Sequence, residues 1–198
     1  MTEEERLLRI VLTTRAEVLH AGFTTSSCIL STRVLMGVLD YLGISAKPVA
    51  VTVVAFNAKG WELHNAGKPL EDDDAWSVGI EGTGKRRRNA TTGRMDWDGH
   101  LIVLTDDGYL LDPSLDQLSR PARALTLTPL ASKLSGPLRN DSHQGFSRND
   151  GTVILYRLLD LPNSSWSNSA DWRQKHQEIR TVTATVIRRL KESLKESS

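Results

Sequence analysis

The stretch GHLIVLTDDGYLLDPSLDQ, residues 99–117, contains the pattern that decides the fold. Two apolar runs, residues 100–105 and 109–112, flank Asp106-Asp107-Gly108. An Asp-Gly pair between apolar runs is a strong signal for a hairpin. We therefore expect an antiparallel pair of strands here, with the turn at residues 106–108.

The length of this turn decides which side chains share a face of the hairpin. A three-residue loop pairs Thr105 with Tyr109 and places His100 and Asp112 on one face, as diagonal neighbours. A two-residue turn would reverse the parity and put Asp112 on the opposite face. An interaction between His100 and Asp112 therefore depends on the longer loop or on a bulge.

The amino-terminal segment predicts an amphipathic helix. Thr2 and Glu5 have the Ser/Thr-x-x-Glu spacing of a capping box, and leucine and valine residues follow at helical spacing. We expect this helix to run from residue 3 to about residue 20, with Gly22 as its stop.

A helix that contains the cysteine and then a strand are expected next. Ser26 and Ser27 can cap a helix that is apolar over more than one face, and such a helix is buried. Cys28 falls in its first turn, and Gly43 stands where a glycine ends it. Residues 47–56 are rich in β-branched side chains and predict a strand.

The remaining segments carry weaker patterns. Residues 57–96 lose periodicity and are predicted to form a long loop or irregular insertion, and residues 113–151 a connection. Residues 152–159 predict a third strand, and residues 170–195 one long carboxy-terminal helix. Since 39% of the residues are hydrophobic, we expect one globular domain over residues 1–198.

Composition and charge argue against several functional classes. The 25 Lys and Arg residues nearly balance the 24 Asp and Glu residues, so a net charge of +1 gives no general attraction to nucleic acid or to an anionic membrane. Without a signal-peptide pattern or an apolar run of ~18 residues, we expect a soluble, cytoplasmic protein.

Cysteine and histidine usage bears on cofactors. A single cysteine, Cys28, excludes an internal disulfide and a zinc site with several cysteines. The histidines outside the hairpin have no metal-ligand spacing; these are His20, His64, His143 and His176. We therefore expect no metal and no cofactor.

The chemistry of Cys28 points toward His100 and Asp112. A cysteine is a nucleophile only as its thiolate, and the unpaired N–H groups at a helix amino terminus favour that anion. A thiol nucleophile also needs a base within hydrogen-bond reach and a third group that orients the base. His100 and Asp112 have the chemistry for these two roles.

Each of these residues also has a structural interpretation. A lone cysteine on a buried helix is more often a small core residue than a nucleophile. His100 can be a satisfied interior histidine, and Asp112-Pro113 can be a strand-ending turn. The three residues together, in this order, favour catalysis.

At this point the sequence resembles a known family. Cys28 at a helix start, the turn Leu42-Gly43-Ile44, then Gly99-His100 and Asp112-Pro113 look like the transglutaminase-like superfamily, a branch of the papain-like cysteine-nucleophile fold. The resemblance covers roughly residues 22–117. It implies an α+β fold in which the nucleophile helix packs against an antiparallel sheet, with Cys28 as nucleophile, His100 as base and Asp112 as orienting carboxylate.

The resemblance implies acyl transfer on a peptide or protein amide through a thioester. Ile102 stands where members usually carry an aromatic residue, and Gly22 stands where papain has its oxyanion glutamine, which leaves the backbone N–H of Cys28 as the one identified donor. The sequence does not choose between a peptidase or amidase and a transglutaminase. A non-catalytic binding module that retains the fold is the alternative.

Two charged clusters lie in the predicted insertion. The clusters, at residues 71–74 (EDDD) and 85–88 (KRRR), are most simply solvated loop faces; the functional alternative is a flap over the cleft that selects substrate. Residues 79–85 (GIEGTGK) match part of a phosphate-binding loop, but Arg86 stands where that motif needs Ser or Thr, which argues against it.

Overall fold

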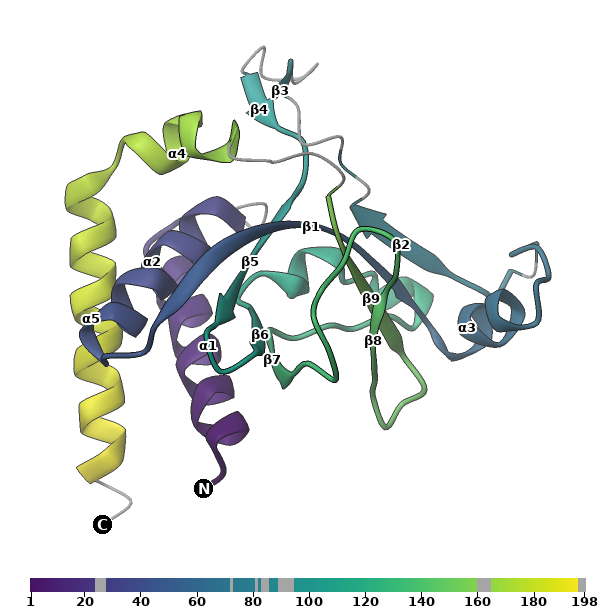
Figure 1. Ribbon diagram of the computed structural model, residues 1–198, viewed down its shortest axis with the longest axis horizontal. Helices are drawn as coiled ribbons and strands as arrows, with labels where there is room; N and C mark the ends of the chain where they lie inside the picture. Colours follow the sequence, from purple (N-terminus) through teal and green to yellow (C-terminus); the bar gives the residue numbers. More distant parts are fainter. Residues whose placement is uncertain are drawn as a thin grey trace.

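The protein, seen in a computed structural model that describes residues 1–23, 28–71, 73–80, 82, 86–88, 95–159 and 165–195, has an α+β fold (Figure 1). The α-helices are α1 (Glu3–His20), α2 (Cys28–Tyr41), α3 (Ala58–Asn65), α4 (Ala170–Arg173) and α5 (His176–Lys195). The short 3-10 helices are η1 (Leu115–Leu118), η2 (Pro121–Arg123) and η3 (Ser165–Asn168). The strands are β1 (Ala46–Phe56), β2 (Ser77–Ile80), β3 (Arg86–Arg88), β4 (Met95–Trp97), β5 (His100–Thr105), β6 (Tyr109–Asp112), β7 (Leu130–Lys133), β8 (Gln144–Ser147) and β9 (Val153–Leu158).

One antiparallel sheet forms the centre of the molecule. Its order is β7-β6-β5-β1-β9-β8, and β2 pairs with the last residues of β1. The long strand β1 pairs with β5 through residues 46–51 and with β9 through residues 51–56, so it bends across the whole sheet (Figure 1). This arrangement places β5 beside β1 and β6 beside β5, next to the helices.

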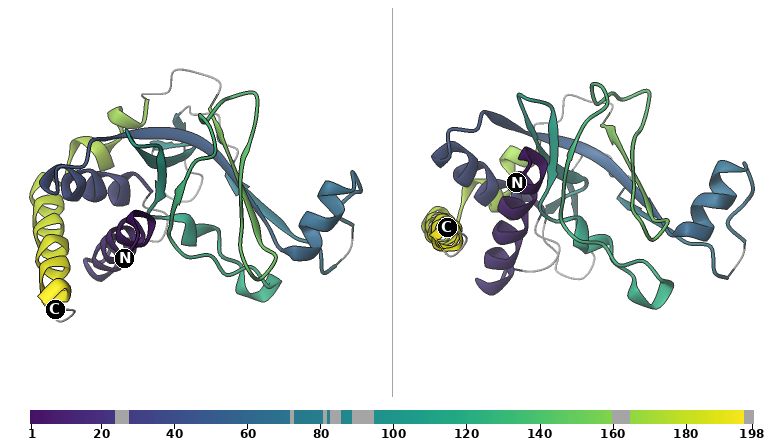
Figure 2. Two further views of the ribbon diagram at one scale, coloured as in Figure 1. Left: turned by 60° about the horizontal axis from the view of Figure 1, so that its bottom comes forward. Right: turned by 90° about the horizontal axis from the view of Figure 1, so that it is seen from below.

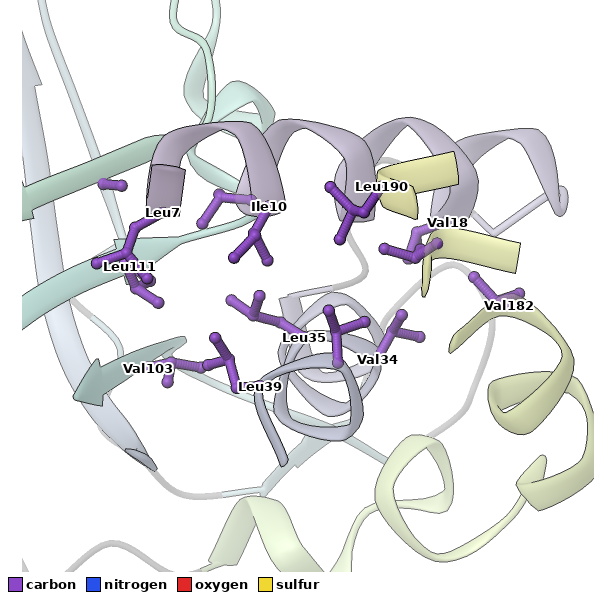
Figure 3. Close-up of a cluster of buried hydrophobic side chains, with 14 of the residues drawn as sticks. Leu7, Ile10, Val18, Val34, Leu35, Leu39, Val103, Leu111, Val182 and Leu190 are labelled. Atoms are coloured by element: carbon purple, nitrogen blue, oxygen red, sulfur yellow. The ribbon is translucent and has the colours of Figure 1, made fainter. Parts of the chain in front are cut away.

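The helices cover one face of the sheet and a second core fills the other. Helices α1, α2 and α5 pack with Val103 and Leu111 in a cluster of buried aliphatic side chains (Figure 3). The neighbouring residues Ile102 and Leu110 point to the opposite face, where they pack with Leu115 of η1. Because side chains alternate along a strand, His100 lies on the same face as Ile102.

The first two helices agree with their sequence signals. Thr2 and Glu5 form the expected capping box, and α1 ends at His20, before Gly22 with its φ of +80°. Helix α2 ends in a Schellman motif, since the N–H of Ile44 donates to the carbonyl of Leu39 at 2.9 Å and Gly43 has a φ of +70°. Ser26 and Ser27, expected to cap α2, lie outside the described residues.

The hairpin confirms the three-residue loop. Leu104 pairs with Leu110 and Val103 with Leu111, a register that puts Thr105 opposite Tyr109. Gly108 has a φ of +78°, the left-handed conformation that such loops need at their last position. His100 and Asp112 therefore lie on one face of the sheet, as the longer loop requires.

Two expectations for the weaker segments are wrong, and the carboxy-terminal helix is confirmed except for a break near its start. Residues 57–96 contain α3, capped by the Asn57 side chain, and β2, which extends the sheet. Residues 113–151 contain β7 and β8, whose four-residue length is too short for a clear alternation. Residues 170–195 form two helices, because Lys175 adopts a φ of +58° between α4 and α5.

The break between α4 and α5 is held by a residue from another helix. The Arg33 guanidinium on α2 donates to the carbonyls of Asp171, at 2.9 Å, and of Gln174. The carbonyl groups of a helix end need such donors when the helix stops. Among the described residues, no helix has the length and apolar character that a membrane crossing requires.

Candidate active site

The hairpin brings His100 and Asp112 into direct contact. Nε2 of His100 lies 2.7 Å from Oδ2 of Asp112, and both side chains are fully buried. A buried carboxylate is tolerated only where partners compensate for its lost hydration. The strand pairing thus builds a charged pair inside the protein, at the place where the sequence predicts it.

Two further groups hold the Asp112 carboxylate. The hydroxyl of Tyr156 on β9 donates to Oδ2 at 2.8 Å, and the N–H of Ser114 donates to Oδ1 at 3.0 Å. Sequence analysis missed Tyr156, although it is the one aromatic hydroxyl in β9 (VILYRL). With three donors in reach, the carboxylate is fixed in position.

Cys28 begins α2 and lies beside the start of β5. Its Sγ is 4.0 Å from the carbonyl oxygen of Gly99, and the side chain is 8% exposed. One turn along α2, the hydroxyl of Thr32 donates to the carbonyl of Leu101 at 3.0 Å, which ties the helix to the strand that carries His100. A Cβ at Gly99 would lie 2.5 Å from the Trp97 ring, so the present position of that ring requires glycine at position 99.

The charges around His100 favour its protonated form. Burial alone would lower the pKa of His100, but the charge and hydrogen bond of Asp112, together with a hydrogen bond and the thiolate charge of Cys28, raise that pKa to about 10. Burial and the Asp112 charge also raise the pKa of Tyr156 well above its usual value, so its hydroxyl stays a donor. The site therefore favours the imidazolium form of His100.

A glutamine that sequence analysis missed contacts the other nitrogen of His100. Nε2 of Gln117, on η1, is 2.7 Å from Nδ1 of His100. The next residue back, Asp116, pairs with the buried Arg15 of α1 at 2.8 Å. No sequence signal marks Gln117, since its role follows from the path of the chain after Asp112.

Aromatic side chains contribute to the buried cluster that contains Cys28. Cys28 belongs to an apolar cluster with Trp97, and Trp166 and Trp172 pack against that cluster. The last two rings meet edge to face, with centroids 4.4 Å apart. Such a cluster keeps the local dielectric low, which strengthens the charge interactions at His100.

The two charged clusters of segment 57–96 lie at different places. Glu71, Asp73 and Asp74 follow α3, which lies at the opposite end of the molecule from α2 (Figures 1 and 2). The basic residues of β3 pair with β4, which leads directly into β5. The acidic cluster is thus remote from Cys28, contrary to a flap in which both clusters border the cleft.

Glu81 and residues 83–85 of the GIEGTGK motif lie outside the described residues.

Metal binding finds no support in the described part of the chain. There, no group of three or more His, Cys, Asp or Glu side chains has an arrangement that could hold a metal ion.

Comparisons with known proteins give one fold relative and no family. No protein-family model matches the sequence, and no curated protein matches it significantly. A similar solved structure, a crystal structure named genomics APC5867, has 16% sequence identity and a TM-score of 0.51, over 93% of this chain and 78% of that chain. At this level of identity the likeness shows a shared α+β fold.

Proposed function

We propose that the chain is a cysteine-dependent acyl-transfer enzyme of the papain/transglutaminase-like fold, which acts on a peptide or protein amide. Cys28 is the nucleophile, His100 the acid and base, and Asp112 the orienting carboxylate. The contact of buried His100 with Asp112 at 2.7 Å, beside a cysteine at a helix start, is the observation that carries the proposal. A positioned base and its orienting group are what a thiol nucleophile requires.

The first half of the reaction forms a thioester. The Cys28 thiolate attacks the amide carbon, a C–S bond forms, and the carbonyl electrons move to oxygen. The backbone N–H groups at the start of α2 are donors for that oxyanion. As the C–N bond breaks, Nδ1 of His100 gives its proton to the leaving amine, because Asp112 holds Nε2.

The second half of the reaction returns the free thiolate. An acceptor, either water or an amine, attacks the thioester while His100 takes its proton, and the C–S bond breaks. Water as acceptor makes a peptidase or amidase, and an amine makes a transglutaminase. The same three side chains serve both outcomes, so the acceptor has to be identified by experiment.

Alkylation of the single cysteine tests the nucleophile. We expect iodoacetamide to label the native protein at pH 7 about tenfold faster, or more, than the same chain unfolded in urea. Intact mass reports on Cys28 alone, because the chain has one cysteine. His100→Gln should remove the difference. Native labelling no faster than unfolded labelling would instead favour a binding module that retains the fold.

Trapping of the acyl-enzyme tests the reaction. A library of peptide amides with a fluorescent leaving amine should give a covalent adduct on Cys28 and release of the amine, and neither with Cys28→Ala. Addition of a primary amine should divert the product if the enzyme is a transglutaminase. If no amide in a broad library forms the adduct, the proposal of acyl transfer is wrong.

A further inference from the structure

Gln117 contacts the nitrogen of His100 through which the proposed reaction moves its protons. Its side-chain Nε2 is 2.7 Å from Nδ1 of His100, while Nε2 of the imidazole faces Asp112. The imidazole is fully buried. Both of its nitrogens therefore have a protein partner at hydrogen-bond distance.

An amide is suited to a nitrogen that changes its protonation state. The amide group offers an N–H donor and a carbonyl acceptor, and rotation of its last bond exchanges them. When His100 is neutral with its proton on Nε2, Nδ1 can accept a hydrogen bond from the side-chain N–H of Gln117. When His100 is an imidazolium, its Nδ1–H can donate a hydrogen bond to the side-chain oxygen of Gln117.

The turn that carries Gln117 is fastened to the helix that carries Cys28. Arg15 on α1 pairs with Asp116 at 2.8 Å, and its Nη1 donates to the hydroxyl of Ser31 on α2 at 3.1 Å. Arg15 is 3% exposed, so this bridge is shielded from water. The distance between the Gln117 turn and the start of α2 is thereby fixed from outside the triad.

We propose that Gln117 is a positioning residue that hydrogen-bonds Nδ1 of His100 before and after each proton transfer and so keeps the imidazole in place, and that it releases Nδ1 while this nitrogen exchanges its proton with Cys28 or the leaving amine. This inference rests on the proposed function, because the alignment matters only if His100 exchanges protons in a reaction.

Other groups around His100 have to be considered in any titration. The imidazole interacts with Asp112 of β6 and Cys28 of α2, and Tyr156 of β9 binds the Asp112 carboxylate. The pair of Arg15 with Asp116 adjoins Gln117 in the chain. All of them stay unchanged in variants at position 117. A difference between such variants therefore reports on the amide.

Two variants of similar size separate the possible roles of the amide. Gln117→Glu keeps an acceptor, and Gln117→Met keeps the length without a hydrogen-bonding group. Ring-nitrogen NMR of histidine-labelled protein, with His100→Gln for assignment, follows the protonation of His100 directly. We expect the midpoint to rise in Gln117→Glu and to fall by about one pH unit, tenfold in proton affinity, in Gln117→Met, because hydrogen bonds to the charged form are the stronger ones.

Turnover should fall in both variants, by about tenfold or more in kcat with little change in KM. The reason is that each new side chain can hydrogen-bond Nδ1 in at most one of the two protonation states of His100. Gln117→Asn, which keeps the amide on a shorter side chain, should keep more activity than either. The matched control is Gln144→Met, which removes a glutamine of β8 that accepts a hydrogen bond from Ser135. It should change neither the midpoint of His100 nor kcat. Circular dichroism confirms that each variant is folded.

Midpoints that move in the same direction in Gln117→Glu and Gln117→Met, or that do not move, would overturn the role of Gln117. An unchanged kcat in Gln117→Met would also overturn the role of Gln117. If the wild type still forms the acyl-enzyme in that case, the proposed function is unaffected. Opposite shifts with no acyl-enzyme in any variant would support the contact with His100 and remove the acyl-transfer proposal. The titration needs no substrate, so the two failures are distinct.

Discussion

Nε2 of His100 and Oδ2 of Asp112 lie 2.7 Å apart, and water reaches neither side chain. The two residues stand on neighbouring strands of a hairpin whose three-residue turn sets their parity. Removal of one member of such a pair leaves the other without its main partner in a dry interior. Four predictions follow the contacts outward from this pair.

Asp112→Asn should retain the fold and lose about 10⁴-fold in turnover, because the amide cannot support the imidazolium and favours the wrong tautomer of His100. The measurement is kcat on an amide that the wild type uses, with circular dichroism for the fold. Asp107→Asn, in the exposed turn of the same hairpin, is the control and should remain active. Near-wild-type turnover of Asp112→Asn would make Asp112 a turn residue.

The free energy of unfolding should depend on the protonation of His100. The folded pKa of about 10 lies above the unfolded value of 6.5, so the stabilisation is fully present below pH 6.5 and is lost as pH rises toward 10. Urea titrations at several pH values should show a decline on the order of a few kcal/mol across this window. Tyr156, with its raised pKa, adds to the decline only at higher pH.

A His100→Gln variant is the control for this pH dependence. It should be less stable than the wild type at pH 6.5, and its curve should be flatter between pH 6.5 and 10. An equally steep decline in both proteins would show that other groups cause it.

Tyr156→Phe should destabilise the fold by about 1–3 kcal/mol, because the buried Asp112 carboxylate loses a hydroxyl donor at 2.8 Å. It should also slow turnover by about tenfold, since the carboxylate is then less firmly oriented. Tyr109→Phe removes a hydroxyl from the same sheet without a contact to Asp112 and serves as the matched control. Urea unfolding and kcat are the measurements, and equal effects of the two changes would argue against a special role for Tyr156.

Arg15→Met should destabilise the protein by about 3–5 kcal/mol, because it leaves Asp116 without the guanidinium that binds it. Arg6→Met, which breaks an exposed pair with Glu3, should cost about 1 kcal/mol or less. Thermal unfolding compares the two variants. A similar small loss in both would show that the Arg15 bridge does not fasten the Gln117 turn.

The sequence determined the features that depend on near neighbours along the chain. The capping box at Thr2 follows from side-chain hydrogen bonds between residues three apart, and the glycine stop at Gly43 follows from a left-handed backbone conformation that few residues adopt. The hairpin itself could be predicted from Asp107-Gly108, but the parity that puts His100 and Asp112 on one face was decided by the three-residue turn of the folded chain. Short elements such as α3 and β7 were not predicted from the sequence, because four to eight residues give too little hydrophobic periodicity.

Only the tertiary structure decided which distant groups complete the site. Tyr156 lies 44 residues beyond Asp112, and Gln117 reaches back to His100 across the end of the hairpin. The end of α4 is likewise held by Arg33, 138 residues before its carbonyl partner at Asp171. No local pattern encodes these contacts, because they arise when separate elements pack together and buried polar groups must find partners wherever the folded chain supplies them.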